Sequence, residues 1–268
     1  MGYQYRKINE DTYLIQGDGH ESMYLISGRD RSMLVDAGME PESLKQITDQ
    51  LSDKSVFCVL THGHFDHIGM CGEYEEVYLD KKDLDLYEKH SKGDMMPGMK
   101  FCCRKKEEIL LMKKEFDLGE HRIVTVSLPG HTKGSVIFCD MKNRSVFCGD
   151  TVGSGCGVLM TAGLGSLPLD AYQQGLREAI SELEQLGVDE TWNFYGGHDG
   201  QQYASRTGPY NPITLKLIKD MEILCGKLLD HSAEKQESVK DTPFGSLREI
   251  VSIYGNAELQ LLIEEETI

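Results

Sequence analysis

The chain has 268 residues, of which 40% are hydrophobic and 27% charged, and this length allows one large domain or two small ones with a substantial core. The formal net charge of −16 argues against nucleic acid and anionic membranes as partners, because both are polyanions. The sequence contains no uninterrupted run of about 18 apolar residues, so no transmembrane helix is predicted. Met1–Lys7 lacks the apolar core of a secretory signal.

The N-terminal part predicts short strands and then a helix. Turn residues separate three β-like runs, so antiparallel pairing is expected for Thr12–Gln16, Met23–Ser27 and Ser32–Asp36. Pro41 then opens an amphipathic helix. The apolar face of this helix is Leu44, Ile47 and Leu51. The strands Val56–Leu60 and Val77–Leu79 follow, with a histidine-rich stretch between them.

Residues 80–118 are rich in lysine, glutamate and aspartate, and helices are expected near Asp83–His90 and Lys105–Phe116. We interpret this segment as a helical cap inserted over one face of the domain. Its apolar side chains either line a substrate pocket or, in the more ordinary alternative, pack the insertion onto the core. These side chains are Met95, Met96, Met99 and Phe101.

The second half again alternates strands and helices. The expected strands are Ile123–Leu128, Val136–Asp140, Ser145–Cys148 and Thr191–Tyr195. A helix capped by Asp170 and stopped by Gly187 lies before the last strand. Asn211-Pro212 starts another helix, with an inner stripe of Leu217, Met221, Leu224 and Leu228. The tail from Ser246 fits either a helix or a hairpin that turns at Gly255-Asn256.

This order of elements predicts an α/β architecture of two packed sheets with helices outside. No internal repeat or low-complexity linker divides the chain. We therefore predict a single domain over residues 1–268, with the helical cap at 80–118 and a helical or hairpin extension at 208–268.

The eight cysteines form no CxxC pair, so a thiolate zinc finger is not expected. Cys58, Cys139 and Cys148 fall in apolar runs, where a free thiol behaves as a small buried hydrophobe. A reducing, cytoplasmic compartment is the simplest explanation. The expected partner is a small-molecule substrate, and assembly into a homo-oligomer stays open.

Histidine and aspartate follow the ends of several predicted strands. The stretch Thr61–His67 places three imidazoles and one carboxylate directly after Val56–Leu60. Three later strand ends are each followed by one such residue, and these are His131, Asp150 and His198. Strand ends along one edge of a sheet sandwich converge on a single cleft, and rigid strands place ligands accurately. The pattern therefore predicts a cleft lined by side chains that bind metal ions.

The stretch His62–His67 matches the HxHxDH signature of the metallo-β-lactamase superfamily, and the three later residues follow in the order of its remaining ligands. The runs Met23–Ile26 and Leu34–Gly38 also resemble the strands that precede the signature in that family. The resemblance implies a four-layer αβ/βα sandwich with two metal ions. It implies that one metal is held by His62, His64 and His131. The second would be held by Asp66, His67 and His198, with Asp150 bridging the two.

Imidazole and carboxylate without thiolate suit Zn²⁺ best, although Fe and Mn are also compatible. Two such cations about 3.5–4 Å apart share one water and bring its pKa to about 7, so the expected nucleophile is a bridging hydroxide. The expected catalytic carboxylates are Asp66 and Asp150. The reaction that follows is hydrolysis of a small activated acyl substrate, namely a thioester, ester or lactone. Asp36 resembles the family's residue that orients a ligand imidazole, and an ordinary turn aspartate is the alternative.

The ligand set resembles that of glyoxalase II. Asp150 argues against β-lactamase activity, because the lactamases of this superfamily generally lack the bridging aspartate. Val158 stands where glyoxalase II has a basic glutathione contact, so another thioester or an ester is the expected substrate. Three tyrosines near the last ligand are candidate substrate contacts, because a phenol can donate to a developing oxyanion, and core packing is the alternative. They are Tyr195, Tyr203 and Tyr210.

Three other functions stay open. Di-iron redox proteins use this fold, but with a fused flavin domain for which 268 residues leave no room. A small-molecule phosphodiesterase would use similar ligands, while the absence of a basic run disfavours a polynucleotide. A metal-binding domain without catalysis ranks last, because all seven ligand positions are filled.

Overall fold

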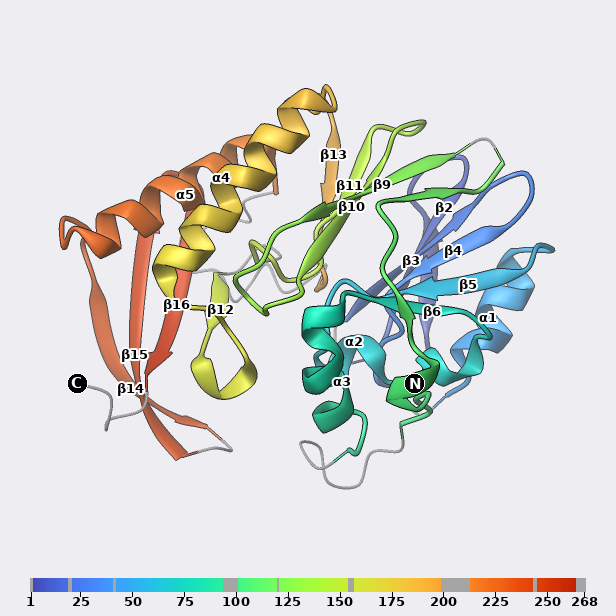
Figure 1. The fold of residues 1–268 in the computed structure, drawn as a ribbon, viewed down its shortest axis with the longest axis horizontal. Helices are drawn as coiled ribbons and strands as arrows, with labels where there is room; N and C mark the ends of the chain where they lie inside the picture. Colours follow the sequence, from blue (N-terminus) through green and yellow to red (C-terminus); the bar gives the residue numbers. More distant parts are fainter. Residues whose placement is uncertain are drawn as a thin grey trace.

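The structure, a computed structural model, describes residues 2–18, 21–40, 42–93, 101–119, 121–153, 157–198, 213–242 and 245–263. The strands in this part of the chain form three sheets of seven, five and four strands. The two larger sheets face each other, and the third lies on the far side of the two long helices, α4 (Leu169–Gln185) and α5 (Leu215–Leu229) (Figure 1).

The first sheet keeps its strands in chain order, antiparallel from β1 to β4 and parallel from β4 to β7. Its strands are β1 Gln4–Lys7, β2 Thr12–Gln16, β3 Ser22–Ser27, β4 Ser32–Val35, β5 Val56–Val59, β6 Val77–Leu79 and β7 Leu110–Leu111. Both faces are covered, so β3 is apolar at successive positions: Met23 and Leu25 face one core cluster, and Tyr24 and Ile26 face another.

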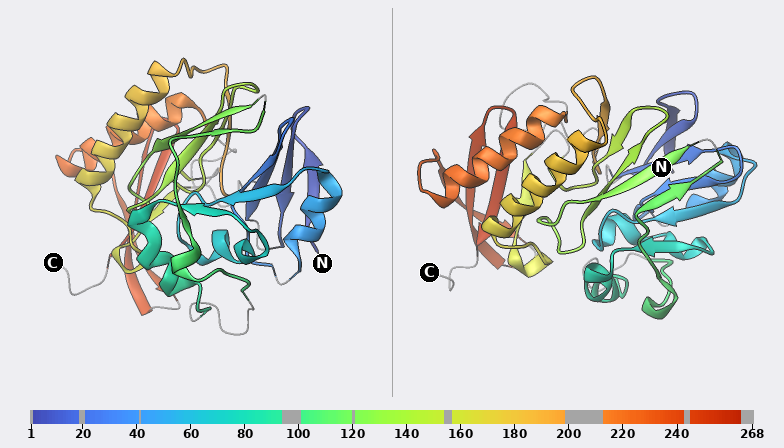
Figure 2. Two further views of the ribbon diagram at one scale, coloured as in Figure 1. Left: turned by 45° about the vertical axis from the view of Figure 1, so that its right-hand side comes forward. Right: turned by 45° about the horizontal axis from the view of Figure 1, so that its top comes forward.

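Helices cover the outer face of this sheet (Figure 2). They are α1 (Leu44–Leu51), α2 (Phe65–Ile68) and α3 (Leu84–His90), with the short 3₁₀ helices η1 (Cys71–Glu73) and η2 (Lys81–Asp83) beside them. Leu44, Ile68 and Tyr87 from the three α-helices are buried in one cluster with the outward-facing residues of the sheet. The four residues of α2 carry half of the HxHxDH signature, so the packing of α2 on the sheet fixes part of the candidate site.

The second sheet has the order β13-β11-β10-β9-β8. Its strands are β8 Glu115–Asp117, β9 Arg122–Ser127, β10 Val136–Asp140, β11 Ser145–Phe147 and β13 Asn193–Tyr195. It meets the first sheet through an aromatic core, in which the rings of Phe57 and Phe116 stack with centroids 5.4 Å apart. Phe138 and Phe147 are fully buried in the same layer.

Phe138→Ala is expected to lower the free energy of unfolding by about 3–5 kcal/mol, because the inter-sheet core would keep much of the resulting cavity. Urea denaturation at 25 °C measures this loss. Val239→Ala is the control: Val239 is 67% exposed on the third sheet, so its truncation should change the free energy of unfolding by less than about 0.5 kcal/mol. Similar losses for the two variants would contradict the assignment of Phe138 to the core.

Helix α4 packs against both the second sheet and α5, and α5 in turn packs on the third sheet. The strands of that sheet are β12 Val158–Met160, β14 Gln236–Thr242, β15 Gly245–Tyr254 and β16 Ala257–Ile263, in the order β12-β16-β15-β14. Asp220 of α5 accepts hydrogen bonds from Lys216 and from the backbone amide of Asn256, which ties the β15–β16 turn to the helix. Strand β12 pairs with β16, so the C-terminal hairpin contacts a segment that leads into the candidate site.

The predicted αβ/βα sandwich is confirmed, and so are most of its strands. The inner stripe of α5 is buried as predicted, and α4 stops at Gly187, whose φ of 78° places it in the left-handed region. Three helix starts differ from the prediction. Ser43 caps α1, with Pro41 outside the described residues, and Pro168 rather than Asp170 precedes α4. Asn211-Pro212, the predicted start of α5, also lies outside the described residues, and Thr214 caps that helix.

The helix predicted near Lys105–Phe116 is wrong. Only a 3₁₀ turn, η3 (Lys106–Glu108), forms there, followed by β7 and β8. Strand β7 extends the first sheet, whereas β8 extends the second and buries Phe116 between the two. Segment 80–118 is therefore helical mainly in α3, and tertiary pairing outweighs the helix propensity of its lysines and glutamates. Phe101 packs beside Gly69, whereas Met95, Met96 and Met99 lie outside the described residues.

The tail forms a hairpin that turns at Gly255-Asn256, so the helix alternative is wrong there. Cys58, Cys139 and Cys148 are buried free thiols as predicted. Among the described residues, no helix combines the length and apolar character needed to cross a membrane.

Candidate metal centre

The candidate ligands lie where strands of the two facing sheets end. His62 and His64 occupy the turn between β5 and α2, and Asp66 and His67 lie on α2 itself. Strands β11 and β13 are parallel, and Phe147 pairs with Tyr195 at their ends. Asp150 and His198 each lie three residues beyond this pair, so the strand register places them side by side. His131 follows β9 in the same sheet.

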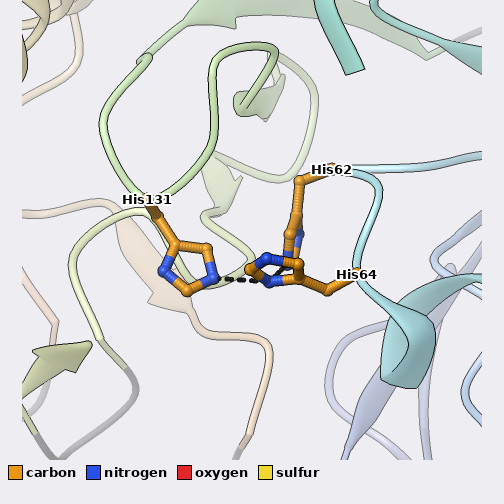
Figure 3. Close-up of side chains that lie close together, drawn as sticks. All are labelled: His62, His64 and His131. Atoms are coloured by element: carbon orange, nitrogen blue, oxygen red, sulfur yellow. Dashed lines mark hydrogen bonds between the residues drawn. The ribbon is translucent and has the colours of Figure 1, made fainter. Parts of the chain in front are cut away.

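Three imidazoles converge from two loops (Figure 3). His64 Nδ1 lies 3.0 Å from His62 Nε2 and 2.9 Å from His131 Nε2. All three rings are almost fully buried, at 1%, 6% and 5% exposure for His62, His64 and His131. The structure thus brings together the three residues predicted for one metal.

Backbone carbonyls assign the tautomers of two of these rings. His131 Nδ1 lies 2.8 Å from the carbonyl oxygen of Leu159, and His64 Nε2 lies 2.8 Å from that of Leu164. A carbonyl oxygen only accepts, so each of these nitrogens carries the proton. His131 Nε2 and His64 Nδ1 therefore direct lone pairs at each other. The segment 159–164 that supplies both carbonyls was not singled out from the sequence.

Asp36 assigns the tautomers of His62 and His67. Its Oδ2 accepts from His67 Nδ1 at 2.9 Å and from the Thr61 hydroxyl at 2.8 Å. Because that hydroxyl already donates to Asp36, it accepts from His62 Nδ1 at 3.0 Å. Asp36 is 2% exposed and also accepts the backbone N–H of Thr61, so it is fixed in place. The Nε2 atoms of His62 and His67 consequently face the site.

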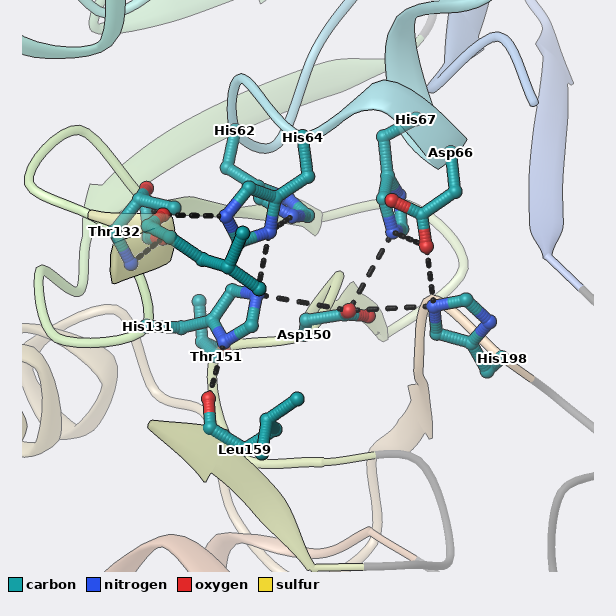
Figure 4. A network of polar contacts seen from close by, with 12 residues as sticks. His62, His64, Asp66, His67, His131, Thr132, Asp150, Thr151, Leu159 and His198 are labelled. Carbon is teal, nitrogen blue, oxygen red and sulfur yellow. Dashed lines mark hydrogen bonds and ion pairs between the residues drawn. The ribbon is translucent and has the colours of Figure 1, made fainter. Parts of the chain in front are cut away.

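The second group contains Asp66, His67, Asp150 and His198, whose ligand atoms lie within 4.8 Å of one another (Figure 4). His198 Nε2 lies 3.3 Å from Asp150 Oδ2 and 3.4 Å from Asp66 Oδ2. Asp150 Oδ2 is also 3.5 Å from His67 Nε2 and 3.7 Å from His131 Nε2. Asp150 thus stands between the two groups, at the position predicted for a bridging ligand.

The two groups differ in charge. Burial lowers the pKa of His62 well below its ordinary value and that of His64 to about 3, and the neighbouring imidazoles add to the effect. Burial also disfavours charge on His198, but Asp150 and Asp66 outweigh it and raise its pKa to about 10. The same carboxylates, with Asp36, raise the pKa of His67 well above the usual range against the effect of burial.

These features fit metal cations. In the three-histidine group the low pKa values keep His62 and His64 neutral, and the ring nitrogens that face each other offer lone pairs that a cation would satisfy. In the second group, His67 Nε2 and Asp150 Oδ1 are buried and have no hydrogen-bond partner within the described part of the chain. Imidazole and carboxylate donors of this kind suit Zn²⁺, Fe and Mn.

Tyr172 supports two of the ligand loops and was also missed from the sequence. Its hydroxyl donates to the carbonyl oxygen of Thr151 at 2.5 Å, next to Asp150. Its ring packs so closely on the turn before His131 that a Cβ on Gly130 would lie 1.9 Å from it. The side chain is fully buried. A contact between α4 and distant loops leaves no pattern in the local sequence, which explains the omission.

A cavity of about 260 Å³ opens beside both groups. Ligand side chains form part of its lining, and Phe65, Val158, Leu159 and Leu164 form an apolar wall. The described lining contains no lysine or arginine. Tyr195 is not part of it, because its ring stacks on Phe147 at 5.5 Å in the core between the sheets, as in the packing alternative. Tyr203 and Tyr210 lie outside the described residues.

The fold and the order of these side chains define a class of protein. Residues 16–198 match the metallo-beta-lactamase superfamily, and the chain belongs to it.

Several known proteins share limited identity with this chain. The probable metallo-hydrolase YqgX of Bacillus subtilis is 27% identical over 198 residues, which cover 71% of this chain and 90% of that protein. The acyl-coenzyme A thioesterase MBLAC2 of Gallus gallus is 24% identical over 185 residues, covering 57% and 67%. Among solved structures, TTHA1623 in a di-iron-bound form has a TM-score of 0.55 at 25% identity, covering 75% of this chain and 93% of that one.

Proposed function

We propose that the protein is a dinuclear metal-dependent hydrolase that cleaves a small activated acyl substrate: a thioester, ester or lactone. The observation that carries this proposal is the joining of two ligand groups through Asp150, with tautomers that turn ring nitrogens towards the site. His62, His64 and His131 would hold one metal, and Asp66, His67 and His198 the other. Zn²⁺ is our first choice, and Fe or Mn would suit the same donors.

Bound metals would supply a hydroxide nucleophile at neutral pH and polarise the acyl carbonyl. The chain's own residues contribute position and exclusion of water. Asp66 and Asp150 lie 3.4 and 3.3 Å from His198 Nε2, where a carboxylate can accept a proton from an attacking water. Leu159 and Leu164 orient two ligand rings through their carbonyl oxygens, while their segment forms the apolar wall.

The cavity favours an uncharged acyl group beside the metals. Its apolar wall includes Val158, which stands where glyoxalase II, whose ligand set this chain resembles, has a basic glutathione contact. The absence of lysine and arginine from the described lining gives a phosphodiester anion no partner besides the metals. The similarity to an acyl-coenzyme A thioesterase agrees with this chemistry. A small acyl thioester is therefore the substrate we would test first.

Hydrolysis of thioesters, esters, lactones and phosphodiesters by zinc-, iron- and manganese-loaded protein tests the proposal. We expect turnover of at least one acyl class, and loss of that activity in His131→Ala and Asp66→Asn. Each variant should be shown to be folded by circular dichroism. If phosphodiesters alone are cleaved, the proposed reaction class is wrong.

Zinc binding to the two groups should displace different numbers of protons. At pH 7 His198, with a pKa of about 10, holds a proton that zinc must displace, so zinc affinity of its group should rise about tenfold per pH unit for each proton released. In the three-histidine group, burial lowers the pKa of His62 well below its usual value and that of His64 to about 3, so these two rings release no proton when zinc binds between roughly pH 6 and 8. Calorimetric titration in two buffers of different ionisation enthalpy counts the protons. Equal release in both binding steps would contradict this difference.

A further inference from the structure

Asp83 is a buried carboxylate outside both ligand groups. It lies at the junction of η2 and α3 and is 1% exposed. Within the described part of the chain it forms no ion pair with lysine, arginine or histidine, so neutral donors alone satisfy it. A carboxylate buried in this way needs several well-placed donors, because its desolvation is otherwise costly.

The donors to Asp83 come from two different ligand loops. Oδ2 accepts the backbone N–H of Gly63, which stands between His62 and His64, at 2.9 Å. The same oxygen accepts the Thr132 hydroxyl at 2.6 Å, and Oδ1 accepts the backbone N–H of Gly134 at 2.6 Å. One side chain therefore connects the loop of His62 and His64 with the loop of His131, although about 70 residues separate these loops in sequence.

These hydrogen bonds require that both side-chain atoms at the end of residue 83 act as acceptors. An asparagine amide at residue 83 would present its NH₂ group to at least one of the N–H or O–H donors, which a carboxylate does not. The fit is also close, because a Cβ on Gly134 would lie 2.8 Å from the carboxyl carbon of Asp83. The two loops can thus approach each other only as far as this carboxylate allows.

Helix α3 also contacts the turn that carries His62 and His64. Gly63 packs against the backbone of Asp83 and Tyr87, where an added Cβ would lie 3.1 Å from each. One turn further on, the ring of His90 stacks on His64 with centroids 5.4 Å apart and an interplanar angle of 26°. The start of α3 therefore sets the position of the first ligand loop, and Asp83 extends that control to the second.

We propose that Asp83 is a positioning residue for the three-histidine metal group: its carboxylate fixes the separation between the His62–His64 turn and His131, and so sets the metal affinity of that group alone. This role rests on the proposed dinuclear function. The second group has its own support, since Asp36 accepts a hydrogen bond from His67 directly. Among the described residues, the hydrogen bonds of Asp83 come from Gly63, Thr132 and Gly134 and from no residue of the second group.

The test is a titration of metal-free protein with Zn²⁺ in competition with a chromophoric chelator, in which the wild type should show two binding steps. His64→Ala identifies the step that belongs to the three-histidine group. Asp83→Asn should weaken that step by about ten- to a hundredfold and change the other by no more than about twofold. The absorption spectrum of Co²⁺ bound at the weakened step should shift as well, since its geometry depends on the ligand separation.

Asp140→Asn is the matched control. Asp140 is fully buried and accepts backbone amides of Lys142 and Asn143 at the β10–β11 turn, away from both groups, so both zinc steps should stay unchanged. Thr132→Val removes one hydrogen-bond donor to Asp83 and should weaken zinc binding by the three-histidine group by a smaller factor. This variant tests the positioning role if Asp83→Asn does not fold.

If folded Asp83→Asn binds zinc with wild-type affinity in both steps, the positioning role is overturned and the proposed function stays intact. If Asp83→Asn does not fold, the same result for Thr132→Val overturns the positioning role. Equal weakening of both steps would also overturn it. A wild-type protein that binds no zinc, iron or manganese would overturn the positioning role together with the proposed function.

Discussion

Asp36→Asn is expected to weaken zinc binding by both ligand groups by at least about 100-fold while the protein stays folded. The asparagine oxygen would keep the N–H of Thr61, and its NH₂ group would then face His67 Nδ1 and the Thr61 hydroxyl. His67 would have to move its proton to Nε2, the nitrogen that faces the site. The Thr61 hydroxyl would be released to donate to His62 Nδ1, which moves the proton of His62 to Nε2 as well.

The backbone should tolerate this substitution. Asp36 has a φ of 61°, and asparagine adopts the left-handed region as readily as aspartate. Zinc titration gives the two affinities, and ¹⁵N chemical shifts of the imidazoles report the tautomers directly. Asp140→Asn again serves as the control for loss of a buried carboxylate. Wild-type affinity together with wild-type tautomers would show that Asp36 does not control the ligand rings.

Asp150→Asn is expected to lower kcat/KM by at least about 10³-fold, which corresponds to about 4 kcal/mol of transition-state stabilisation. The carboxylate of Asp150 lies 3.3–3.7 Å from three imidazole nitrogens of the two groups. An amide is uncharged and has one oxygen in place of two, so it binds two metal ions less strongly. The metal content should fall below two ions per chain. Elemental analysis and steady-state kinetics on the best acyl substrate measure the two effects.

Asp189→Asn is the matched control for this substitution, because Asp189 is exposed on the loop before β13 and pairs with Arg144. It should retain both metals and the wild-type rate. An Asp150→Asn variant that kept two metals and a rate within about tenfold of the wild type would contradict the bridging role of Asp150.

Much of the architecture could be predicted from local sequence patterns. Alternating or continuous apolar runs bounded by turn residues gave the positions of β2, β3, β9 and β10 to within a residue or so, because strand burial leaves a direct imprint on side-chain type. The seven candidate ligands were singled out for a related reason: each follows a strand, and strands of two packed sheets can end along a common edge.

Local patterns failed where long-range pairing decided the structure. The stretch from Lys105 to Phe116 has the lysine and glutamate content of a helix, yet Leu110 pairs with Tyr78 in the first sheet, and Phe116 fills the core between the sheets. The tail was undecided for the same reason, because its hairpin depends on contacts with α5 that no local pattern records.

The sequence by itself therefore determined the superfamily resemblance, the sheet-forming runs and the identity of the candidate ligands, since these depend on residue type and order. Only the tertiary structure decided the tautomers of His62, His64, His67 and His131, the position of Asp150 between the groups, and the joining of the ligand loops by Asp36, Asp83 and Tyr172. Those properties arise from hydrogen bonds of about 3 Å between residues that are remote in the chain, and chain order does not encode such distances locally.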